Sequence, residues 1–215
     1  MLIDSVSDLH GSYPRMKGGD LLIVAGDLTA ADLGHQYAHF RMWLQDLKYR
    51  KKIVVAGNHD GLIQGGRWNI DRPEGFDYLQ DQAIEFEGLK IYGSPWTPSF
   101  CDWHFMKMRG QELREIWGLI PRDTDILITH GPPNGILDQV EPGEEHLGCI
   151  DLWLAVKKIK PMMHVFGHIH GGYGQKTIEY GQKNPENGRK KTIFVNAAHC
   201  NEHYEPFNKP IRVIL

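Results

Sequence analysis

The sequence predicts one α/β domain, of the α+β kind with mixed sheets, because short runs rich in β-branched residues alternate with segments of helical periodicity. The chain has 215 residues, 41% hydrophobic and 24% charged, a composition that fits a single domain over residues 1–215. No purely apolar run is longer than that of residues 21–25, which is far short of the roughly 20 residues that cross a bilayer. The N-terminus also lacks the pattern of a secretory signal. We therefore expect a cytoplasmic protein without a membrane-spanning segment.

The strands are predicted from β-branched and aliphatic runs that are bounded by turn residues. Polar and apolar residues alternate on both sides of Gly88, which predicts a hairpin over residues 85–91. A second hairpin is expected over residues 175–191. The predicted strands cover residues 2–6, 21–25, 53–56, 83–86, 90–92, 126–129, 163–166, 192–195 and 211–214.

Three helices are expected between these strands. Apolar residues recur every three or four positions over residues 37–47, and Asp32 is the expected cap of that helix. A helix near residues 149–160 should stop at Pro161, and another is expected over residues 111–117.

Charge and cysteine content exclude several classes of protein. The net charge is −3 at pH 7, whereas proteins that bind nucleic acid or anionic membranes usually carry a basic excess. The three cysteines are widely spaced and form no C-x-x-C pair, which disfavours a disulfide scaffold or a zinc ribbon. The 12 histidines are the unusual feature of the composition, and their positions carry the functional information.

Residue types that bind metals follow several predicted strands directly. Ligand sites in open sheets lie beyond the carboxyl ends of the strands, so loops at this edge can converge on one crevice. Glycines adjoin these positions and allow the close backbone approach that convergence requires. The candidate metal ligands are Asp8, His10, Asp27, Asn58, His130, His168 and His170.

This donor set is too large for one ion. A catalytic zinc needs about three protein ligands, whereas oxygen and nitrogen donors without thiolates suit two ions of borderline or hard character. Two ions about 3.5–4 Å apart are the arrangement used for hydrolytic attack at phosphorus. Each pair of residues alone also fits an ordinary polar turn, but their occurrence together at successive strand ends favours a metal centre.

The ordered motifs resemble those of the calcineurin-like metallophosphoesterase superfamily. They are Asp8-x-His10, Gly26-Asp27, Gly57-Asn58-His59-Asp60, Thr129-His130-Gly131-Pro132-Pro133 and Gly167-His168-Ile169-His170. Residues 92–96, 125–129 and 164–174 are similar to the metallophosphoesterase-domain-containing branch. The resemblance covers nearly the whole chain. It implies two mixed β-sheets packed as a sandwich, flanked by helices, with a dimetal site at the carboxyl ends of the strands.

The resemblance also implies a role for each site residue. Asp8, His10 and His170 would bind the first metal, Asp27 would bridge, and Asn58, His130 and His168 would bind the second. His59 would be the catalytic histidine, acting on the leaving-group oxygen while a metal-bridging hydroxide attacks in line. Manganese is the expected metal, with iron, zinc, cobalt and nickel as alternatives.

The implied function is hydrolysis of small phosphodiesters, in particular cyclic nucleotides such as cAMP, cGMP or 2′,3′-cyclic nucleotides. Trp96, Trp103 and His199 are candidate substrate-binding residues, since an indole face can stack on a nucleobase. The alternatives are a phosphomonoesterase or nuclease of the same superfamily, or a protein-binding scaffold without catalysis. A nucleic-acid substrate is not favoured by the charge, and the complete ligand set argues against a scaffold.

Two features depart from the pattern of relatives. Some relatives place an acidic residue three positions after the bridging aspartate to orient the catalytic histidine, but this chain has Ala30 there. Asp60 is then the candidate partner of His59. The insertion over residues 175–191 carries several basic residues, and it is interpreted as a solvated hairpin or, alternatively, as a grip on anionic substrate.

Overall fold

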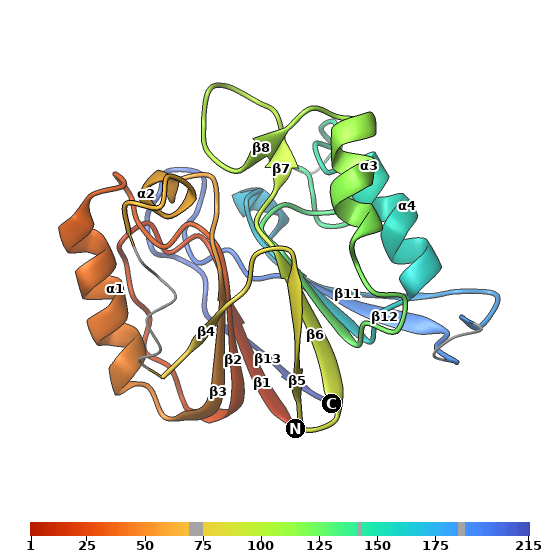
Figure 1. Cartoon of the computed structure of the whole chain (residues 1–215), viewed down its shortest axis with the longest axis horizontal. Helices are drawn as coiled ribbons and strands as arrows, with labels where there is room; N and C mark the ends of the chain where they lie inside the picture. Colours follow the sequence, from red (N-terminus) through yellow and green to blue (C-terminus); the bar gives the residue numbers. More distant parts are fainter. Residues whose placement is uncertain (69–74, 142, 185–187) are drawn as a thin grey trace.

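Two β-sheets form the centre of the computed structural model (Figure 1), which describes residues 1–68, 75–141, 143–184 and 188–215. The first sheet has 5 strands in the order β13-β1-β2-β3-β4, and the second has 6 in the order β11-β12-β10-β9-β6-β5. A small pair, β7 and β8, stands apart from them. The predicted sandwich of two mixed sheets with flanking helices is confirmed.

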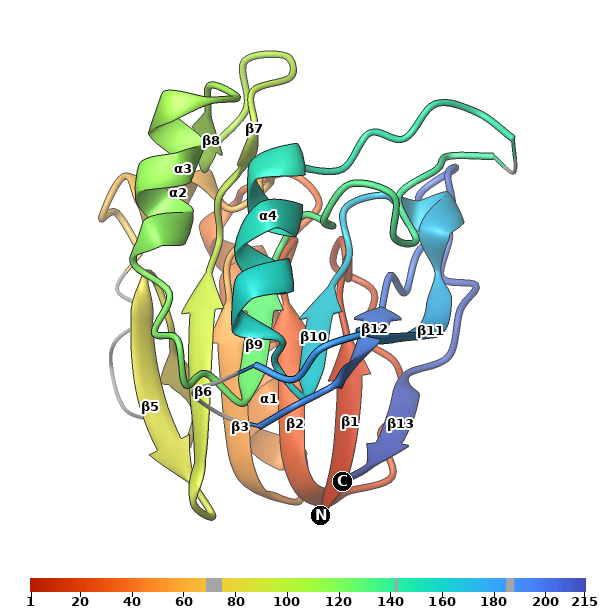
Figure 2. The same cartoon turned by 90° about the vertical axis from the view of Figure 1, so that its right-hand side faces the viewer.

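The strands that end at the candidate ligands are parallel. In the first sheet β1 (Leu2–Val6), β2 (Gly19–Ala25), β3 (Tyr49–Val55) and β4 (Asp77–Tyr78) run parallel, and β13 (Ile211–Ile214) pairs antiparallel with β1. In the second sheet β6 (Leu89–Ser94), β9 (Ile126–Thr129), β10 (Met163–Phe166) and β12 (Lys191–Asn196) run parallel, with β5 (Gln82–Phe86) and β11 (Gly174–Glu179) antiparallel at the two edges. In Figure 2 the arrows of β1, β6 and β10 point to the same end of the molecule, so the loops after the parallel strands gather there.

An apolar core fills the space between the two sheets. Residues of alternate strand positions, such as Ile23 and Ile53 from the first sheet and Ile128 and Val165 from the second, are fully buried in it. Buried aliphatic side chains that contact each other across two sheets are typical of a sandwich, since only one face of each sheet points inward. The core holds the two sets of strand ends at a fixed separation.

Helices cover the outer faces of both sheets (Figure 1). α1 (Gly34–Asp46) packs Tyr37, Phe40 and Leu44 against the first sheet, and α3 (Gln111–Gly118) and α4 (Ile150–Ile159) cover the second. The short α2 (Gly61–Gln64) and a single 3-10 turn, His170–Gly172, lie at the end where the loops gather. Within the described ranges, no helix is long and apolar enough to span a membrane.

Asp32 does not cap α1, contrary to the prediction. The helix begins after Leu33, whose backbone N–H donates to the Gln36 side chain. The Asp32 carboxylate instead accepts hydrogen bonds from the Tyr37 hydroxyl at 2.5 Å and the Leu62 backbone at 2.8 Å. It ties α1 to α2 rather than closing the first turn of α1.

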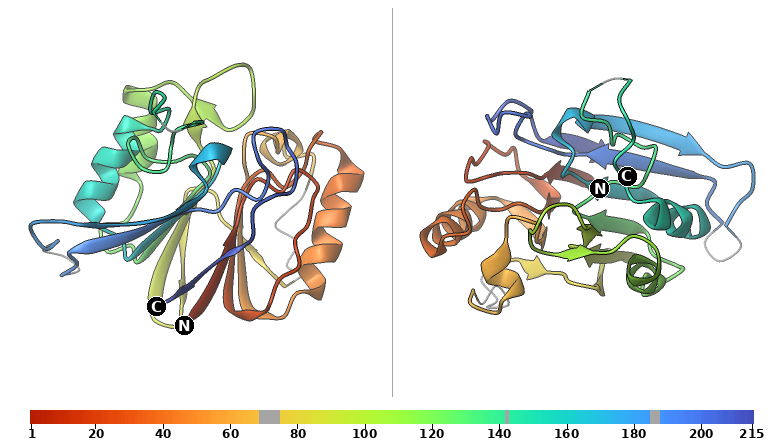
Figure 3. Two further views of the ribbon diagram at one scale, coloured as in Figure 1. Left: turned by 180° about the vertical axis from the view of Figure 1, so that it is seen from behind. Right: turned by 90° about the horizontal axis from the view of Figure 1, so that it is seen from above.

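The expected elements are otherwise present, with some differences at their ends. All predicted strands and helices form, although β3 starts at Tyr49, before the predicted residue 53. Among the described residues, three strands lie outside the predicted strands and hairpins: β4, β7 (Thr97–Pro98) and β8 (Met106–Lys107). The 175–191 hairpin forms as β11 and β12 and projects from its sheet (Figure 3), while its residues 185–187 lie outside the described residues.

Candidate metal centre

The structure brings all seven candidate ligands to the end of the sandwich where the loops gather. Asp8 and His10 follow β1, Asp27 follows β2, and Asn58 follows β3 in the first sheet. From the second sheet, His130 follows β9, and His168 and His170 follow β10. The centre is therefore built between the two sheets, with donors from each.

The donor atoms form two overlapping groups around the Asp27 carboxylate. On one side, His10 Nε2 lies 3.6 Å from Asp27 Oδ2, and His170 Nε2 lies 3.4 Å from Asp8 Oδ1. On the other side, His130 Nε2 lies 3.4 Å from Asp27 Oδ1 and 2.8 Å from Asn58 Oδ1. The ring of His168 has its centroid 5.1 Å from that of His130.

Three triads in the described residues have ligand atoms that all lie within 4.8 Å of one another: Asp8, His10 and His170; Asp8, Asp27 and His130; and His10, Asp27 and His59. Asp27 belongs to two of these triads, and its two oxygens face different histidines: Oδ2 faces His10 and Oδ1 faces His130. This is the geometry in which one carboxylate can serve two ions.

Glycines permit the close packing of the loops. A Cβ at residue 57 would fall within 3 Å of the Asp27 carboxylate and 2.8 Å from His130 Cε1. A Cβ at residue 167 would overlap the Asp8 carboxylate and the Ser7 side chain, with Ser7 Cβ at 2.6 Å. The two carboxylates can approach these backbones only because both positions lack a side chain.

Four of the candidate ligands have backbones in the left-handed region. The φ angles are +51° for Asp8, +42° for His10, +53° for Asp27 and +68° for His168. This conformation is uncommon for residues other than glycine and is concentrated at functional sites. The tight turns after β1, β2 and β10 aim the side chains back across the strand ends.

Hydrogen bonds to the outer ring nitrogens orient two of the histidines. His130 Nδ1 lies 2.9 Å from the Ala25 carbonyl, and His170 Nδ1 lies 2.8 Å from the Asn201 carbonyl. A carbonyl can only accept, so Nδ1 carries the proton in each ring, which leaves the Nε2 lone pair of a neutral ring directed toward the carboxylates.

The residues fit divalent ions. Both ring nitrogens of His10 are buried without a hydrogen-bond partner in the described part of the chain, an arrangement that is unfavourable for an imidazole without a further ligand. The Asp8 and Asp27 carboxylates are also buried, and cations between them would neutralise their charge. Oxygen and imidazole donors without thiolates suit manganese, iron, zinc, cobalt or nickel.

The electrostatics of the centre follow from these contacts. Burial opposes the ionised form of Asp27, but the imidazoles of His130 and His10 outweigh burial and hold the pKa of Asp27 well below its usual 3.8. Burial lowers the pKa of both His130 and His170, but a neighbouring carboxylate has the opposite effect, Asp27 for His130 and Asp8 for His170. The resulting pKa of each ring is raised to about 9. Without metal, these two rings carry protons at pH 7, and metal binding must release them.

The pKa values of the other two candidate histidine ligands are shifted in the opposite direction. Burial lowers the pKa of His10 and of His168 to about 4. Both rings are therefore neutral at pH 7, the form that binds metal.

Asp60 contacts backbone groups rather than the imidazole of His59. Its buried carboxylate accepts hydrogen bonds from the N–H groups of Gly57 at 2.8 Å and Leu28 at 3.1 Å, and burial raises its pKa to about 8. It joins the loop after β2 to the loop after β3. The prediction that Asp60 orients the His59 imidazole is therefore wrong, because the Asp60 carboxylate contacts backbone N–H groups instead.

His59 is held by its backbone and by neighbouring rings. Its N–H donates to Asp27 Oδ1 at 2.9 Å, and its ring centroid lies 4.8 Å from those of His10 and Trp103 and 6.1 Å from that of Tyr204. Among the described residues, its imidazole has no hydrogen-bond partner. The ring faces an open pocket and is partly exposed.

A pocket of about 300 Å³ opens over the centre. His59 and Trp103 line it, whereas Trp96 and His199 are absent from the lining. The Trp96 indole donates to Asp81 Oδ2 at 2.7 Å, and His199 Nδ1 donates to the Asn208 carbonyl at 2.7 Å. Five of the candidate ligands also line the pocket, namely His10, Asp27, Asn58, His168 and His170.

Several lining residues were not expected from the sequence. Phe100, Arg109, Leu147 and Tyr204 come from loops that are distant in sequence and carry no motif.

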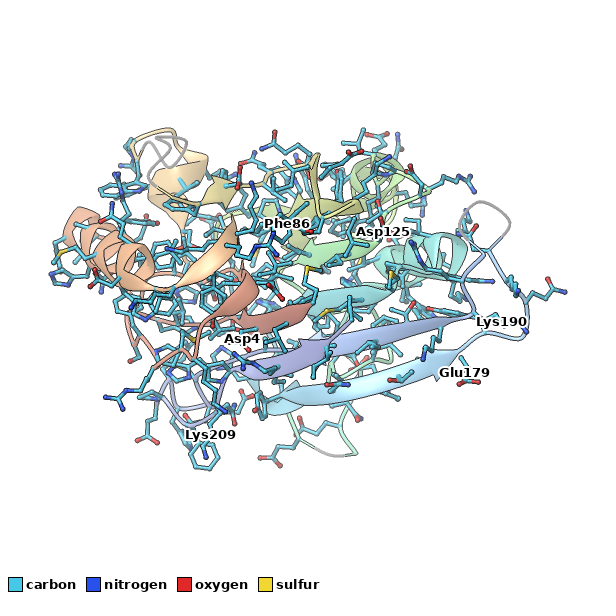
Figure 4. The ribbon with its side chains drawn as sticks, turned by 90° about the horizontal axis from the view of Figure 1, so that it is seen from below. Asp4, Phe86, Asp125, Glu179, Lys190 and Lys209 are labelled. Atoms are coloured by element: carbon cyan, nitrogen blue, oxygen red, sulfur yellow. The ribbon has the colours of Figure 1, made fainter. Side chains whose placement is uncertain are left out.

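The basic insertion does not line this pocket in its described residues. Figure 4 shows Lys190 at the projecting end of the β11–β12 hairpin, in a view from below. Arg189 forms an ion pair with Asp125 and donates to the Thr124 carbonyl at 3.1 Å. This placement favours the interpretation as a solvated hairpin.

Comparison with known proteins gives a consistent result. Residues 1–172 match the family described as calcineurin-like phosphoesterase. Metallophosphoesterase domain-containing protein 1 of Homo sapiens is 40% identical over 98% of this chain and 69% of its own length, and a UPF0046 protein of Caenorhabditis elegans is 35% identical over 92% and 54%.

The solved structures share the fold. The crystal structure of TT1561 of Thermus thermophilus superimposes with a TM-score of 0.58 at 15% identity, covering 99% of this chain and 97% of that one.

Proposed function

The chain belongs to the calcineurin-like phosphoesterase family, and within that family we propose that it is a metal-dependent phosphodiesterase that hydrolyses small diesters such as cyclic nucleotides. The proposal rests on one observation: oxygen and nitrogen donors from both sheets gather at one end of the sandwich, and five of the seven candidate ligands line a pocket that also presents His59. The alternative scaffold function would require none of these donors to be retained.

We propose a ligand set for each of two ions, and the contacts on either side of the Asp27 carboxylate support this assignment. Asp8, His10 and His170 would hold one ion, Asn58, His130 and His168 the other, and Asp27 would contact both. We propose manganese as the metal. Two ions held there would supply Lewis-acid stabilisation of the phosphoryl charge and activation of the attacking water.

His59 supplies the acid of the reaction in this proposal. The attacking water loses one proton to solvent as its oxygen bonds to phosphorus, the bond between phosphorus and the ester oxygen breaks, and the protonated His59 imidazole donates a proton to that departing oxygen. His59 regains a proton from solvent after the product leaves. The hydrogen bond from its backbone N–H to Asp27 fixes the loop relative to the ligands. Trp103 contributes a wall of the pocket beside the leaving group, because its ring lies against that of His59.

The test compares bis-p-nitrophenyl phosphate with p-nitrophenyl phosphate on chelator-treated protein, with and without manganese. Hydrolysis of the diester restored by metal is the expected result, and preference for the monoester would identify a phosphatase instead. Asp27→Ala should lose both bound metal and activity, whereas Asp20→Ala removes a surface carboxylate paired with Arg50 and should retain both. Inactivity of the metal-loaded wild type toward both esters would favour the scaffold.

A further inference from the structure

The pocket has two chemically different ends. Its inner end consists of the candidate ligands, and its outer wall is mostly apolar. Phe100, Trp103, Leu147 and Tyr204 lie in this wall, and their exposed fractions are 57%, 38%, 42% and 50%. Large apolar side chains that stay this exposed around a concave site are typical of a ligand-binding surface.

Trp103 is the member of the wall whose ring lies nearer to His59, since the Tyr204 ring centroid is 6.1 Å from that of His59. The Trp103 and His59 ring centroids are 4.8 Å apart with an interplanar angle of 53°. Phe100 packs against the indole edge to face, at 5.4 Å and 89°. Because Phe100 supports the indole, Trp103 presents a positioned flat surface beside the group that would receive the His59 proton.

Charged side chains contribute little to this part of the pocket. Apart from the candidate ligands and His59, the charged lining residues in the described chain are Arg109 and Glu202. Arg109 donates from its two terminal nitrogens to the carbonyls of Gly148 at 2.9 Å and Leu147 at 2.7 Å. Glu202 accepts from the Gly171 backbone N–H. The outer wall thus offers apolar contact rather than a cradle for a second anionic group.

We propose that the outer wall selects phosphoesters whose organic group carries an aromatic ring, such as a nucleobase or an aryl group, and that Trp103, supported by Phe100, is the specificity-determining residue. This inference rests on the proposed function for the placement of phosphate at the ligands. Stacking on an aromatic side chain contributes enough binding energy to favour a flat aromatic group about 5- to 100-fold over a methyl group in the same position.

The experiment measures binding rather than turnover. Isothermal titration calorimetry of the manganese-loaded protein compares phenylphosphonate with methylphosphonate, which carry the same phosphonate and differ only in the organic group. We expect phenylphosphonate to bind at least about 5-fold more tightly to the wild type. In Trp103→Ala the two dissociation constants should agree within about 2-fold, and Trp103→Phe should retain most of the preference.

Phe207→Ala is the matched control, since it removes an aromatic side chain that is 77% exposed and does not line the pocket; its preference should equal that of the wild type. Equal binding of the two phosphonates to the wild type, binding of neither, or an undiminished preference in Trp103→Ala would overturn the inference. Preferential binding of phenylphosphonate without hydrolysis of either nitrophenyl ester would refute the proposed phosphodiesterase and leave the inference standing.

Discussion

Gly57→Ala is a direct test of how the loops hold the metal centre. Its backbone has no unusual φ requirement, so the effect of the substitution is steric. The added Cβ would meet the Asp27 carboxylate and its backbone nitrogen within 3 Å, and His130 Cε1 at 2.8 Å, where ordinary contacts lie at 3.4–4 Å. Since all of these neighbours are buried, they must shift by about 1 Å to regain van der Waals contact.

A shift of this size exceeds what a metal centre tolerates. Ligand distances are held to about 0.2 Å in metal sites, and a misplacement of about 1 Å costs on the order of 100-fold in rate. We therefore expect Gly57→Ala to lose most of its bound manganese, measured by plasma mass spectrometry after gel filtration. Hydrolysis of bis-p-nitrophenyl phosphate should fall at least about 100-fold.

The control is Gly34→Ala, because a Cβ at the first residue of α1 meets no atom within 4 Å. It should keep metal and activity and gain roughly 0.5–1 kcal/mol of stability from the higher helix propensity of alanine. If Gly57→Ala retained two ions and more than about half of the wild-type rate, the steric argument would be wrong, given the 100-fold loss it predicts.

Three further predictions concern catalysis, pH and metal. His59→Ala should lower turnover of the diester by roughly 10²- to 10⁴-fold with metal content unchanged, and loss of both ions would show that His59 had been misassigned. Burial lowers the pKa of His164, whose Nε2 contacts Thr129 Oγ1, from 6.5 to about 3; between these values the unfolded chain binds the extra proton, so stability falls as the pH falls below 6.5. His164→Gln should therefore lose about 2 kcal/mol less than the wild type between pH 7 and pH 5 in urea unfolding of chelator-treated protein, and an equal loss in both would contradict this. Manganese should raise the Tm of chelator-treated wild type in proportion to the logarithm of its concentration, and an equal rise in Asp27→Ala would mean that the ions bind elsewhere.

The sequence predicted the parts of the fold in which local pattern and tertiary burial agree. β2 and β9 contain continuous apolar runs because both of their faces are buried, which is the pattern of central parallel strands. The candidate ligands were predictable for the same reason, since a buried strand that ends abruptly in Asp, His or Asn has few structural explanations.

The elements outside the predicted strand ranges lack such a pattern. β4, β7 and β8 have 2 residues each, too few to show an alternation or an apolar run. The outer wall of the pocket is assembled from loops that meet only in the folded chain, so Phe100 and Tyr204 carry no periodicity. Asp60 was misinterpreted as the partner of His59 because sequence neighbours in a turn can point in opposite directions, and its carboxylate points inward to backbone N–H groups.

The left-handed backbones of Asp8, His10, Asp27 and His168 have a consequence for evolution. Each position would be relaxed by roughly 1 kcal/mol or more if glycine replaced the candidate ligand, so selection for stability alone acts against the residue found there. A descendant freed from catalysis should accumulate glycine or asparagine at positions 8, 10, 27 and 168 before its sandwich core changes. Substitutions of that kind would identify relatives that keep the fold but have lost the proposed activity.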